Sequence, residues 1–552
     1  MIRLQIKNVL DECFQAGITA GFWSSAGEGK YTVEVPKREG QGEFSTNMAL
    51  ILAGLEPENP REIAAHLVKL LKEKDDLFEQ VEIAGPGFVN MVIRPAVWHQ
   101  IIGKIMTGGD NYGCSSKGEG RKVMVEFVSA NPTGPLSIGH GRQAILGDSI
   151  SRLLEAVGHE VYREYYYNDA GRQMRVLGES TRARYLEKLG EHYSFPEDGY
   201  QGEYIYDIAQ SIIDEHGDLL KNEQDVGIFR DSAEKNIFKD ISATLERMGV
   251  SFDRYYNERT LYEDGHIDSV VEELGRKGFT YEKDGALWFK TTAFGQEQDR
   301  VIIKSSGEPT YRLPDIAYHR EKFKRGFDWL VNVLGSDHIA TVPDVLAGVR
   351  ALDYDDDKVT VILHQFVTLT RDGRQVKMST RKATFVTMDE LLDVVGADAV
   401  RFFFMMRKAD SQLEFDLELA TRESQENPVY YVQYAHARLC SMLRQAPEKG
   451  MAEADADEAD LSLLVQPEEL QLLRTLSAFP EMIENAALEL APHKAIFYLL
   501  ELAGQFHSYY NKHKVISEDL ALSRARLCLV KAMQIVLRNG LYMVGLNAPE
   551  KM

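Results

Sequence analysis

The chain has 552 residues, enough for three or four domains of the usual size of about 150 residues. Its 44% hydrophobic and 27% charged residues give a globular composition, which excludes a wholly disordered or fibrous chain. The net charge of −22 argues against a protein that coats nucleic acid non-specifically, although an acidic body can still carry a local basic face.

The four cysteines lie far apart, and no Cys-x-x-Cys pair occurs, which disfavours zinc-ribbon and redox sites and predicts a reducing, cytoplasmic compartment. The N-terminal segment lacks the apolar stretch of a leader peptide. No window approaches about 18 uninterrupted apolar residues, so we expect no membrane span.

Residues 1–115 are predicted to form a small α+β domain. The pattern indicates a helix over 1–13, a strand at 31–35, helices over 47–55 and from Pro60, and a hairpin over 81–93 around Gly85-Pro-Gly87. The glycine-rich segment 108–120 is the best linker candidate.

Residues 116–415 alternate strand and helix. A buried strand over 122–128, a helix over 141–157 and a strand over 159–167 are typical of the start of a doubly wound parallel sheet. We expect further strands at 300–305, 329–334 and 359–364, with a polar and mostly helical insertion at about 172–299.

Residues 416–552 are predicted to be an all-helical domain, with helices over 430–443, 468–486, 491–511 and 520–544. The expected fold class is therefore α/β: a doubly wound parallel-sheet catalytic domain with a helical insertion, between an α+β domain and an all-α domain.

The segment 126–142, EFVSANPTGPLSIGHGR, contains the most informative turn. Gly139 and Gly141 lack Cβ atoms where a nucleotide could lie against the backbone, and the following helix would point its first N–H groups at phosphates. His140 and Arg142 could stabilise charge on a transferring phosphoryl group. The alternative is a tight strand–helix connection with a structural histidine. No GxxxxGK[ST] motif occurs, which disfavours a Walker-type site.

A second polar segment, VKMSTRKATFVTMDE at 376–390, is short, basic and rich in hydroxyl groups. Lys377, Ser379, Arg381 and Lys382 could neutralise a leaving pyrophosphate, and such a loop could close over it. A solvated surface loop is the alternative.

Here a family resemblance becomes specific. Ser137-Ile-Gly-His140 resembles the HIGH signature of class I aminoacyl-tRNA synthetases, and Lys377-Met-Ser-Thr-Arg381 resembles their KMSKS loop. The strings SANPTGPLSIGHGR, YNDAGRQ, YQGEYI, TYRLPDIAY, GSDH and YYVQYAHAR resemble the arginyl-tRNA synthetases in particular, in the family's order and over essentially the whole chain. The resemblance implies a Rossmann-like HUP catalytic fold.

Two positions depart from the class signatures. Ser137 replaces the first histidine and Thr380 the second lysine, and each change removes a phosphate donor. Ser137 can still give one hydrogen bond. Some arginyl enzymes use a lysine upstream of the HIGH turn instead of the loop lysine, and Lys122 is the candidate here.

A guanidinium is a planar, permanently charged fork that pairs with carboxylates. The resemblance implies an arginine pocket in which Asp315 binds the guanidinium and Asn131 the α-amino or carboxylate end. Without the family, each pocket residue has an ordinary structural explanation. The implied pocket residues are Glu126, Asn131, Tyr311, Asp315 and His338. The implied ATP-binding residues are Pro132, Thr133, Gly134, His140, Gly141, Asp337, Met378 and Ser379, and the implied catalytic residues are Ser137, Gly139, His140, Lys377, Ser379, Arg381 and Lys122.

By the same resemblance, the helical domain contacts the anticodon, with Gln433 and Tyr434 in the matching motif, and Asn47 is a candidate base contact in the N-terminal domain. The implied function is two-step aminoacylation of tRNA(Arg) with L-arginine and ATP, with Mg²⁺ on the nucleotide and no zinc or other protein-bound metal. The expected protein is a monomer that does not contact membranes. Two alternatives stay open: a class I synthetase of other specificity, and a catalytically inactive paralogue that binds tRNA.

Overall fold

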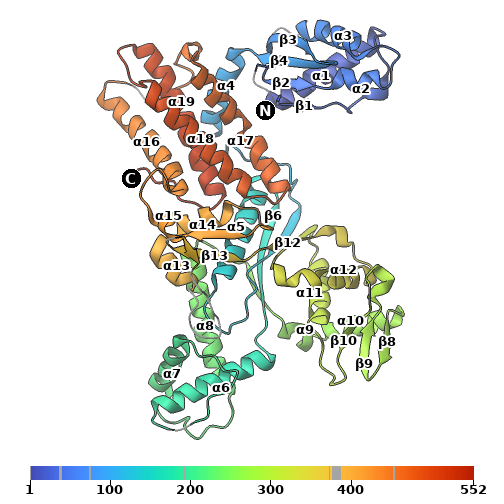
Figure 1. Ribbon diagram of the computed structural model, residues 1–552, viewed down its shortest axis with the longest axis vertical. Helices are drawn as coiled ribbons and strands as arrows, with labels where there is room; N and C mark the ends of the chain where they lie inside the picture. Colours follow the sequence, from blue (N-terminus) through green and yellow to red (C-terminus); the bar gives the residue numbers. More distant parts are fainter. Residues whose placement is uncertain are drawn as a thin grey trace.

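The computed structural model describes residues 2–36, 40–73, 76–191, 193–371, 373–375, 387–451 and 454–552. Figure 1 shows a central sheet with the C-terminal helices above it and two lobes below it. The N-terminal unit, in blue, lies beside the upper end of those helices. None of the described helices is long and apolar enough to cross a membrane.

The N-terminal unit packs three helices against a four-stranded antiparallel sheet of order β1-β2-β4-β3. The predicted hairpin around Gly85 is confirmed, since Ala84 pairs with Phe88 across it. The elements are α1 (Ile2–Thr19), β1 (Val33–Glu34), β2 (Phe44–Thr46), α2 (Met48–Ala53), α3 (Pro60–Lys72), β3 (Phe78–Ala84) and β4 (Phe88–Ile93).

The central sheet has five parallel strands in the order β12-β11-β5-β6-β7. The strands are β5 (Lys122–Glu126), β6 (Glu160–Tyr167), β7 (Arg254–Asn257), β11 (Trp329–Gly335) and β12 (Val359–His364). Because β5 has β6 on one side and β11 on the other, the strand order reverses beside β5. Open parallel sheets bind ligands at the carboxyl ends of the strands at such a point. The predicted α/β fold class is confirmed.

Two details of the predicted sheet are wrong. The insertion is not continuous, because β7 lies within 172–299 and forms the fifth parallel strand. The strand expected at 300–305 is β10 (Arg300–Ile303), which pairs antiparallel with β9 (Ala286–Phe289) in a separate sheet with β8 (Thr280–Lys283). A short apolar run does not reveal which sheet its strand will join, because the pairing partner is set by tertiary packing.

Two groups of helices surround this sheet. The lower lobe in Figure 1 contains helices that contact one another, α6 (Gly171–Lys188), α7 (Glu203–His216) and α8 (Gly227–Arg247). The second lobe joins the β8–β9–β10 sheet to α9 (Arg259–Glu263), α10 (His266–Arg276), α11 (Arg312–Lys324) and α12 (Val342–Ala351). Helix α5 (Ile138–Ala156) connects β5 to β6.

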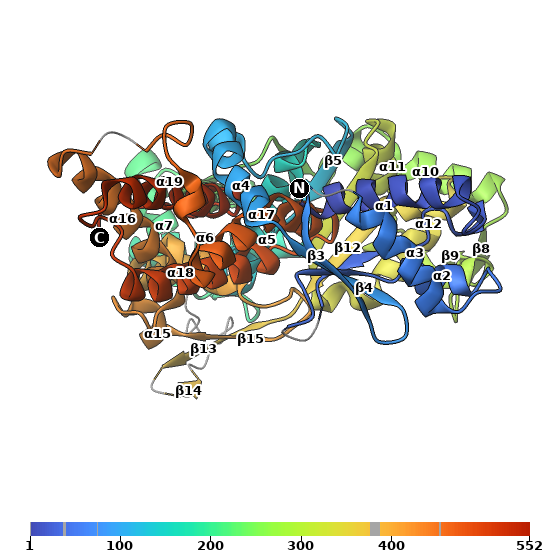
Figure 2. The ribbon, with the colours of Figure 1, turned by 90° about the horizontal axis from the view of Figure 1, so that it is seen from above.

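A smaller sheet follows the parallel sheet in the chain. Strand β13 (Val367–Arg371) pairs parallel with β15 (Leu413–Asp416) and antiparallel with β14 (Arg374–Gln375), which projects at the lower edge of Figure 2. Helices α13 (Met388–Val395), α14 (Ala397–Met405) and α15 (Leu417–Thr421) accompany it. Lys377, Met378, Ser379 and Arg381 lie outside the described residues.

The C-terminal helices form a bundle of α16 (Pro428–Glu448), α17 (Pro467–Leu488), α18 (His493–Lys512) and α19 (Leu520–Met543), close to the predicted ranges. Helix α4 (Pro95–Gly108) packs on α17 and α19, as Figures 1 and 2 also show. The segment expected to be a linker is instead anchored to this bundle, because the Tyr112 hydroxyl donates to the Leu476 carbonyl at 3.0 Å and Lys117 pairs with Glu484 at 2.9 Å.

Candidate active site

A cavity of about 690 Å³ opens at the carboxyl ends of β5, β11 and β12, where the strand order reverses. Its volume lies within the usual range for small-molecule sites. The turn after β5, the end of β6, the loop after β7, the start of α5, the turn after β11, the first turns of α11 and residues of α12 and β13 complete the wall. The sheet, as expected from its topology, therefore supplies the floor of one shared site.

The turn after β5 is strained where it borders this cavity. Val128 and Ser129 have φ angles of 70° and 46°, in the left-handed region that residues other than glycine rarely adopt. Strand β6 holds the turn, because the Tyr165 hydroxyl donates to the Ala130 carbonyl at 2.8 Å and the Tyr166 N–H donates to Ser129 Oγ at 3.3 Å. Such strain costs about 1–3 kcal/mol per residue and clusters at functional sites.

Ser137 and His140 cap the first turn of α5 reciprocally. Ser137 Oγ accepts from the His140 N–H, and His140 Nδ1 accepts from the Ser137 N–H, both at 3.3 Å. Because Nδ1 accepts, the proton of the neutral ring lies on Nε2. Burial lowers the pKa of His140, against the opposing charge of Asp337. The serine that departs from the HIGH signature thus caps the helix and fixes the tautomer of His140.

The two glycines of this turn differ in what surrounds them. A Cβ on Gly139 would meet only Ser137 Oγ, at 3.7 Å, so its backbone is open at the cavity. A Cβ on Gly141 would lie 2.1 Å from Met388 Sδ, so this glycine allows α13 to pack closely. Arg142 is fully buried and donates to the carbonyls of Gln365 and Lys408. Gly141 and Arg142 therefore lie away from the cavity, contrary to the prediction for both.

The acidic wall of the cavity includes Asp315, in the first turn of α11, and Tyr311, which is 83% exposed at the start of that helix. Burial raises the pKa of Asp315 to about 8, helped by the charges of Glu126 and Glu258 and opposed by Lys322 and Arg312. The carboxyl group therefore lacks enough positive charge to stabilise its ionised form. A cationic ligand would supply that charge.

Lys322 carries a buried ammonium group beneath this wall, and the sequence interpretation missed it. Its side chain is inaccessible to solvent, and Nζ lies 2.5 Å from Glu126 Oε2 and 2.8 Å from Asn332 Oδ1. Asn332 bonds to His319 Nε2 at 2.8 Å, and His319 Nδ1 bonds to the Asp315 carbonyl at 2.8 Å. Burial and the Lys322 charge lower the pKa of His319 to about 3. The network therefore holds Glu126 Oε2, while Glu126 Oε1 accepts from Ser129 Oγ at 3.1 Å.

Substituting Lys322→Met tests this network. It would leave the Glu126 carboxylate buried without its cation, so we expect the unfolding free energy to fall by about 3–5 kcal/mol. The double variant Lys322→Met with Glu126→Gln removes both charges and should recover much of that loss. Urea unfolding followed by fluorescence measures both values, and a single variant as stable as the unaltered chain would contradict the expectation.

Glu258 is a second acidic residue that the sequence did not reveal. Its carboxylate accepts hydrogen bonds from the Tyr166 hydroxyl at 2.7 Å and from Asn168 Nδ2 at 2.8 Å, and burial raises its pKa. No motif contains it, since the residue enters the site from the loop after β7. The sequence does give a weak indication of Lys322, because it follows Asp315 by two helical turns and so lies on the same face of α11.

The other predicted ligand-binding residues divide into two groups. Asn131, Asp337 and His338 line the cavity, and Asn131 already bonds to Gln173 at 3.0 Å and to the Asn168 N–H at 3.0 Å. Pro132, Thr133 and Gly134 lie outside the cavity lining, and their ATP role stays a prediction. The Thr133 carbonyl instead accepts from the Tyr204 hydroxyl of α7 at 2.7 Å, which turns this segment toward the inserted lobe.

Lys122 lies at the opposite end of β5 from the cavity. It begins the strand that Glu126 ends, about 13 Å further along at the usual rise of a strand. Its side chain is 55% exposed, and its ammonium lies 4.0 Å from Glu160. The structure therefore places Lys122 outside the cavity, contrary to prediction.

Residues 387–390, the described part of the second polar segment, lie beside the turn that contains Ser137 and His140. Thr387 forms an isolated antiparallel bridge with Ser137, and the Met388 N–H donates to the Leu136 carbonyl at 2.9 Å. Residues about 250 positions apart thus meet at the start of α5.

The three residues predicted to contact RNA differ in accessibility. Asn47 is half-buried, and its Oδ1 accepts from the Thr32 N–H at 2.8 Å. Gln433 is buried and donates to Asp398 of α14 at 2.7 Å and to the Asn547 carbonyl, after α19, at 3.0 Å. These bonds join α16 to other parts of the protein, contrary to the predicted contact of Gln433 with RNA. Tyr434 is half-buried and stacks on Tyr430 at 5.9 Å.

Three family models match consecutive parts of the chain. The arginyl tRNA synthetase N-terminal domain matches residues 1–93, the catalytic domain of class I tRNA synthetases (R) matches 102–414, and the DALR anticodon binding domain matches 432–552.

Curated relatives match over the full length. The chain is 70% identical to an arginine–tRNA ligase of Desulfotalea psychrophila, with all of both chains covered. It is 47% identical to one of Salinibacter ruber, covering 100% of this chain and 99% of the relative. The solved arginyl-tRNA synthetase of Thermus thermophilus, at 22% identity and a TM-score of 0.76 over all of both chains, shares the fold. Together with the HIGH-like turn at the cavity, these matches show that the chain belongs to the arginyl-tRNA synthetases, within class I of the aminoacyl-tRNA synthetases.

Proposed function

We propose that the cavity at the strand ends is where this chain, an arginine–tRNA ligase, activates L-arginine with ATP and transfers it to tRNA(Arg). In the first step, an arginine carboxylate oxygen attacks the α-phosphorus of ATP, the bond to the bridging oxygen breaks and pyrophosphate leaves. In the second, a hydroxyl of the 3′-terminal ribose attacks the arginyl carbonyl and AMP leaves. The enzyme supplies position and charge, and no covalent nucleophile is needed.

The observation that carries the proposal is the poorly compensated acidic wall. Burial and the charges of Glu126 and Glu258 make the Asp315 carboxyl costly to ionise, while Lys322 and Arg312 oppose them only in part. A guanidinium offers five donors and a permanent charge, so it can pair with Asp315 and with the remaining oxygen of Glu126. Tyr311 can stack on the same group. Asn131 then lies at the α-amino or carboxylate end.

ATP would lie with its phosphates at the start of α5. Ser137, Ile138, Gly139 and His140 line the cavity at the positive end of the helix, and the His140 tautomer leaves Nε2–H as a donor. Mg²⁺ would travel with the phosphates, which supply the oxygen ligands it prefers. Lys377, Ser379 and Arg381 keep the pyrophosphate role that the family resemblance implies, with no geometry assigned.

The alternatives are less well supported. An inactive tRNA-binding paralogue is not favoured by 70% identity to an arginine–tRNA ligase over the full length. A synthetase for an acidic or thiol amino acid would have no use for this wall of carboxylates. The monomeric state and the cytoplasmic location stay predictions.

Charging assays with each of the twenty amino acids test the proposal. Purified chain, ATP and a tRNA(Arg) transcript should give charged tRNA with arginine alone. Charging by another amino acid and none by arginine would reject the specificity, whereas no charging at all would favour the paralogue.

Arginine binding should weaken as the pH falls. With an empty-site pKa of about 8, the Asp315 carboxyl is protonated in about nine of ten molecules at pH 7, and it must ionise to pair with the guanidinium. The apparent Kd should therefore rise about tenfold per pH unit below 8 and level off above it. Calorimetry in buffers of different ionisation enthalpy should detect nearly one proton released per arginine at pH 7. Release that persists in Asp315→Asn would contradict the assignment.

The helical bundle is the proposed anticodon contact, through the cluster of Tyr430, Tyr434, Arg438 and His507. These side chains combine stacked rings with a guanidinium that donates to the Tyr434 hydroxyl at 2.6 Å. Since stacking contributes about 1–3 kcal/mol per base, Tyr434→Ala should raise the Kd for tRNA by at least fivefold. Tyr542→Ala, an exposed tyrosine of α19 outside this cluster, is the matched control, and equal effects would reject the assignment.

A further inference from the structure

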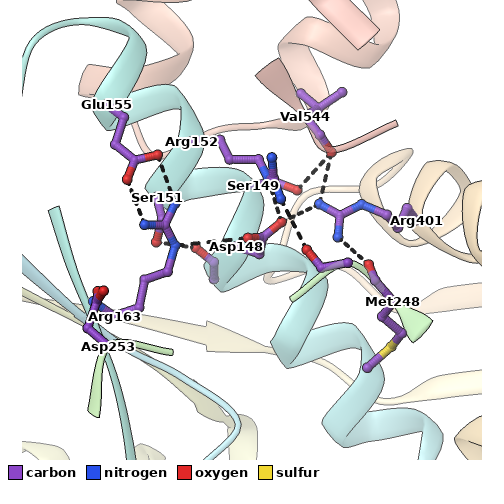
Figure 3. Close-up of polar contacts among 12 residues, drawn as sticks. Asp148, Ser149, Ser151, Arg152, Glu155, Arg163, Met248, Asp253, Arg401 and Val544 are labelled. Atoms are coloured by element: carbon purple, nitrogen blue, oxygen red, sulfur yellow. Dashed lines mark hydrogen bonds and ion pairs between the residues drawn. The ribbon is translucent and has the colours of Figure 1, made fainter. Parts of the chain in front are cut away.

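A single buried guanidinium joins the catalytic helix to two other parts of the molecule. Arg401 of α14 is 1% exposed and lies where α5, α8 and α19 meet (Figure 3). Its Nη1 donates to the Met248 carbonyl at 2.8 Å, and its Nη2 donates to Asp148 Oδ2 at 2.5 Å and to the Val544 carbonyl at 3.0 Å. One side chain therefore bonds to the inserted lobe, the catalytic domain and the C-terminal bundle at once.

Two of these acceptors are the ends of helices. Met248 follows the last residue of α8, and Val544 follows the last residue of α19. Terminal carbonyls have no partner within their own helix and carry partial negative charge. Arg401 satisfies both, so the end of each helix is fixed relative to the same planar group.

Asp148 is the acceptor that leads to the active site. It is 1% exposed on α5, eight residues and about 12 Å along the helix from His140. The same carboxylate accepts from Arg152 Nε at 2.7 Å, and Arg152 donates to the Gly249 carbonyl at 3.1 Å. Figure 3 shows the neighbouring Ser149 directed to the Val544 carbonyl, 3.5 Å away. Helix α5 thus contacts the ends of both α8 and α19.

The close approach at this junction requires a glycine. Gly545 has a φ angle of 75°, and a Cβ there would lie 2.0 Å from Arg401 Nη2. Any residue with a Cβ at position 545 would therefore displace the guanidinium. A displacement of the end of α19 would break its bond to Arg401 and leave a buried donor and acceptor unpaired, which costs about 1–3 kcal/mol for each unsatisfied group.

We propose that Arg401 is a positioning residue for aminoacylation, which couples the position of the C-terminal bundle to the helix that carries His140. Through this link, tRNA bound correctly on the bundle favours the arrangement of α5 that activates arginine. The inference rests on the proposed contact between the bundle and the anticodon. A coupling of this kind is reciprocal and commonly changes a rate or affinity by about 5- to 150-fold.

The test compares two transcripts, tRNA(Arg) and the same tRNA with one anticodon base replaced. The variants are Arg401→Lys, which loses the planar fork, and Asp148→Asn, which keeps the shape and loses the charge. Their matched controls are Arg526→Lys and Glu469→Gln. Arg526 and Glu469 form a buried pair within the bundle, at 2.8 Å between α19 and α17.

In the unaltered enzyme, the anticodon change should lower kcat as well as weaken binding. The kcat ratio is kcat with tRNA(Arg) divided by kcat with the altered transcript. In Arg401→Lys and Asp148→Asn, this ratio should fall about fivefold or more, toward one. The ratio of the two tRNA Kd values should stay unchanged. The controls should keep the original kcat ratio. Asp148→Asn decides the outcome if Arg401→Lys does not fold.

A purely structural role predicts a different pattern. Equal loss of kcat with both transcripts, or the same change of ratio in the control variants, would overturn the coupling alone. An unaltered enzyme that binds and charges both transcripts equally would overturn the anticodon contact and the coupling together.

Discussion

Replacing Asp315 by asparagine should lower kcat/KM for arginine by about 10²- to 4 × 10³-fold, with the KM for ATP nearly unchanged. Removing one partner of a desolvated charge pair costs about 3–5 kcal/mol, and each 1.4 kcal/mol corresponds to a factor of ten. The asparagine also relieves the repulsion among the neighbouring carboxylates, so the free protein should fold normally. Steady-state charging at varied arginine measures the effect.

Adding citrulline as a competitor of arginine shows whether the effect of Asp315→Asn comes from the charge of the ligand. Citrulline has the shape of arginine but a neutral end, so the unaltered enzyme should prefer arginine strongly, and Asp315→Asn should reduce that preference by at least tenfold. Asp353→Asn is the matched control, because the Asp353 side chain is 83% exposed and pairs with Lys277 at 2.7 Å, outside the cavity lining. An unchanged KM for arginine in Asp315→Asn would remove this residue from the pocket.

Replacing His140 by alanine should lower kcat by about 10²- to 10³-fold, the usual effect of losing one donor that stabilises developing charge. Arginine binding should be preserved, because the acidic wall lies on α11 and β5 rather than on α5. Arginine-dependent exchange of pyrophosphate into ATP, measured with tRNA present, reports this step directly.

Two further variants separate the donor from the cap. His140→Gln restores a donor near the position of Nε2 and should recover part of the rate. Ser137→Ala removes the hydroxyl that caps the His140 N–H but keeps the Ser137 N–H that fixes the ring, so its loss should stay below about tenfold. A rate near that of the unaltered enzyme in His140→Ala would exclude the residue from the chemistry.

Much of the fold followed from local patterns. The parallel sheet, the hairpin around Gly85 and the four bundle helices were predicted because hydrophobic period and turn residues act over short stretches of chain. The position of the cavity followed as well, since the carboxyl ends of parallel strands meet at one edge. Asp315 and Tyr311, which line the cavity, were predicted as pocket residues because they belong to one short motif of the family.

The errors share a different origin. The motif that contains Gln433 does not show that its amide is buried against Asp398 and Asn547. Likewise, the short apolar run of β10 does not show which sheet it joins. In each case the deciding contact is with a residue far away in the chain.

The sequence by itself determined the order of the domains, the parallel sheet and the HIGH-like turn, and through the family resemblance it predicted the acidic pocket residues. Only the tertiary structure decided which polar groups are partners: Lys322 with Glu126 across 196 residues, and Arg401 with Asp148 across 253. The physical reason is that a helix or turn is stabilised by near neighbours, whereas a buried charge depends on whichever distant group packing brings within hydrogen-bond distance.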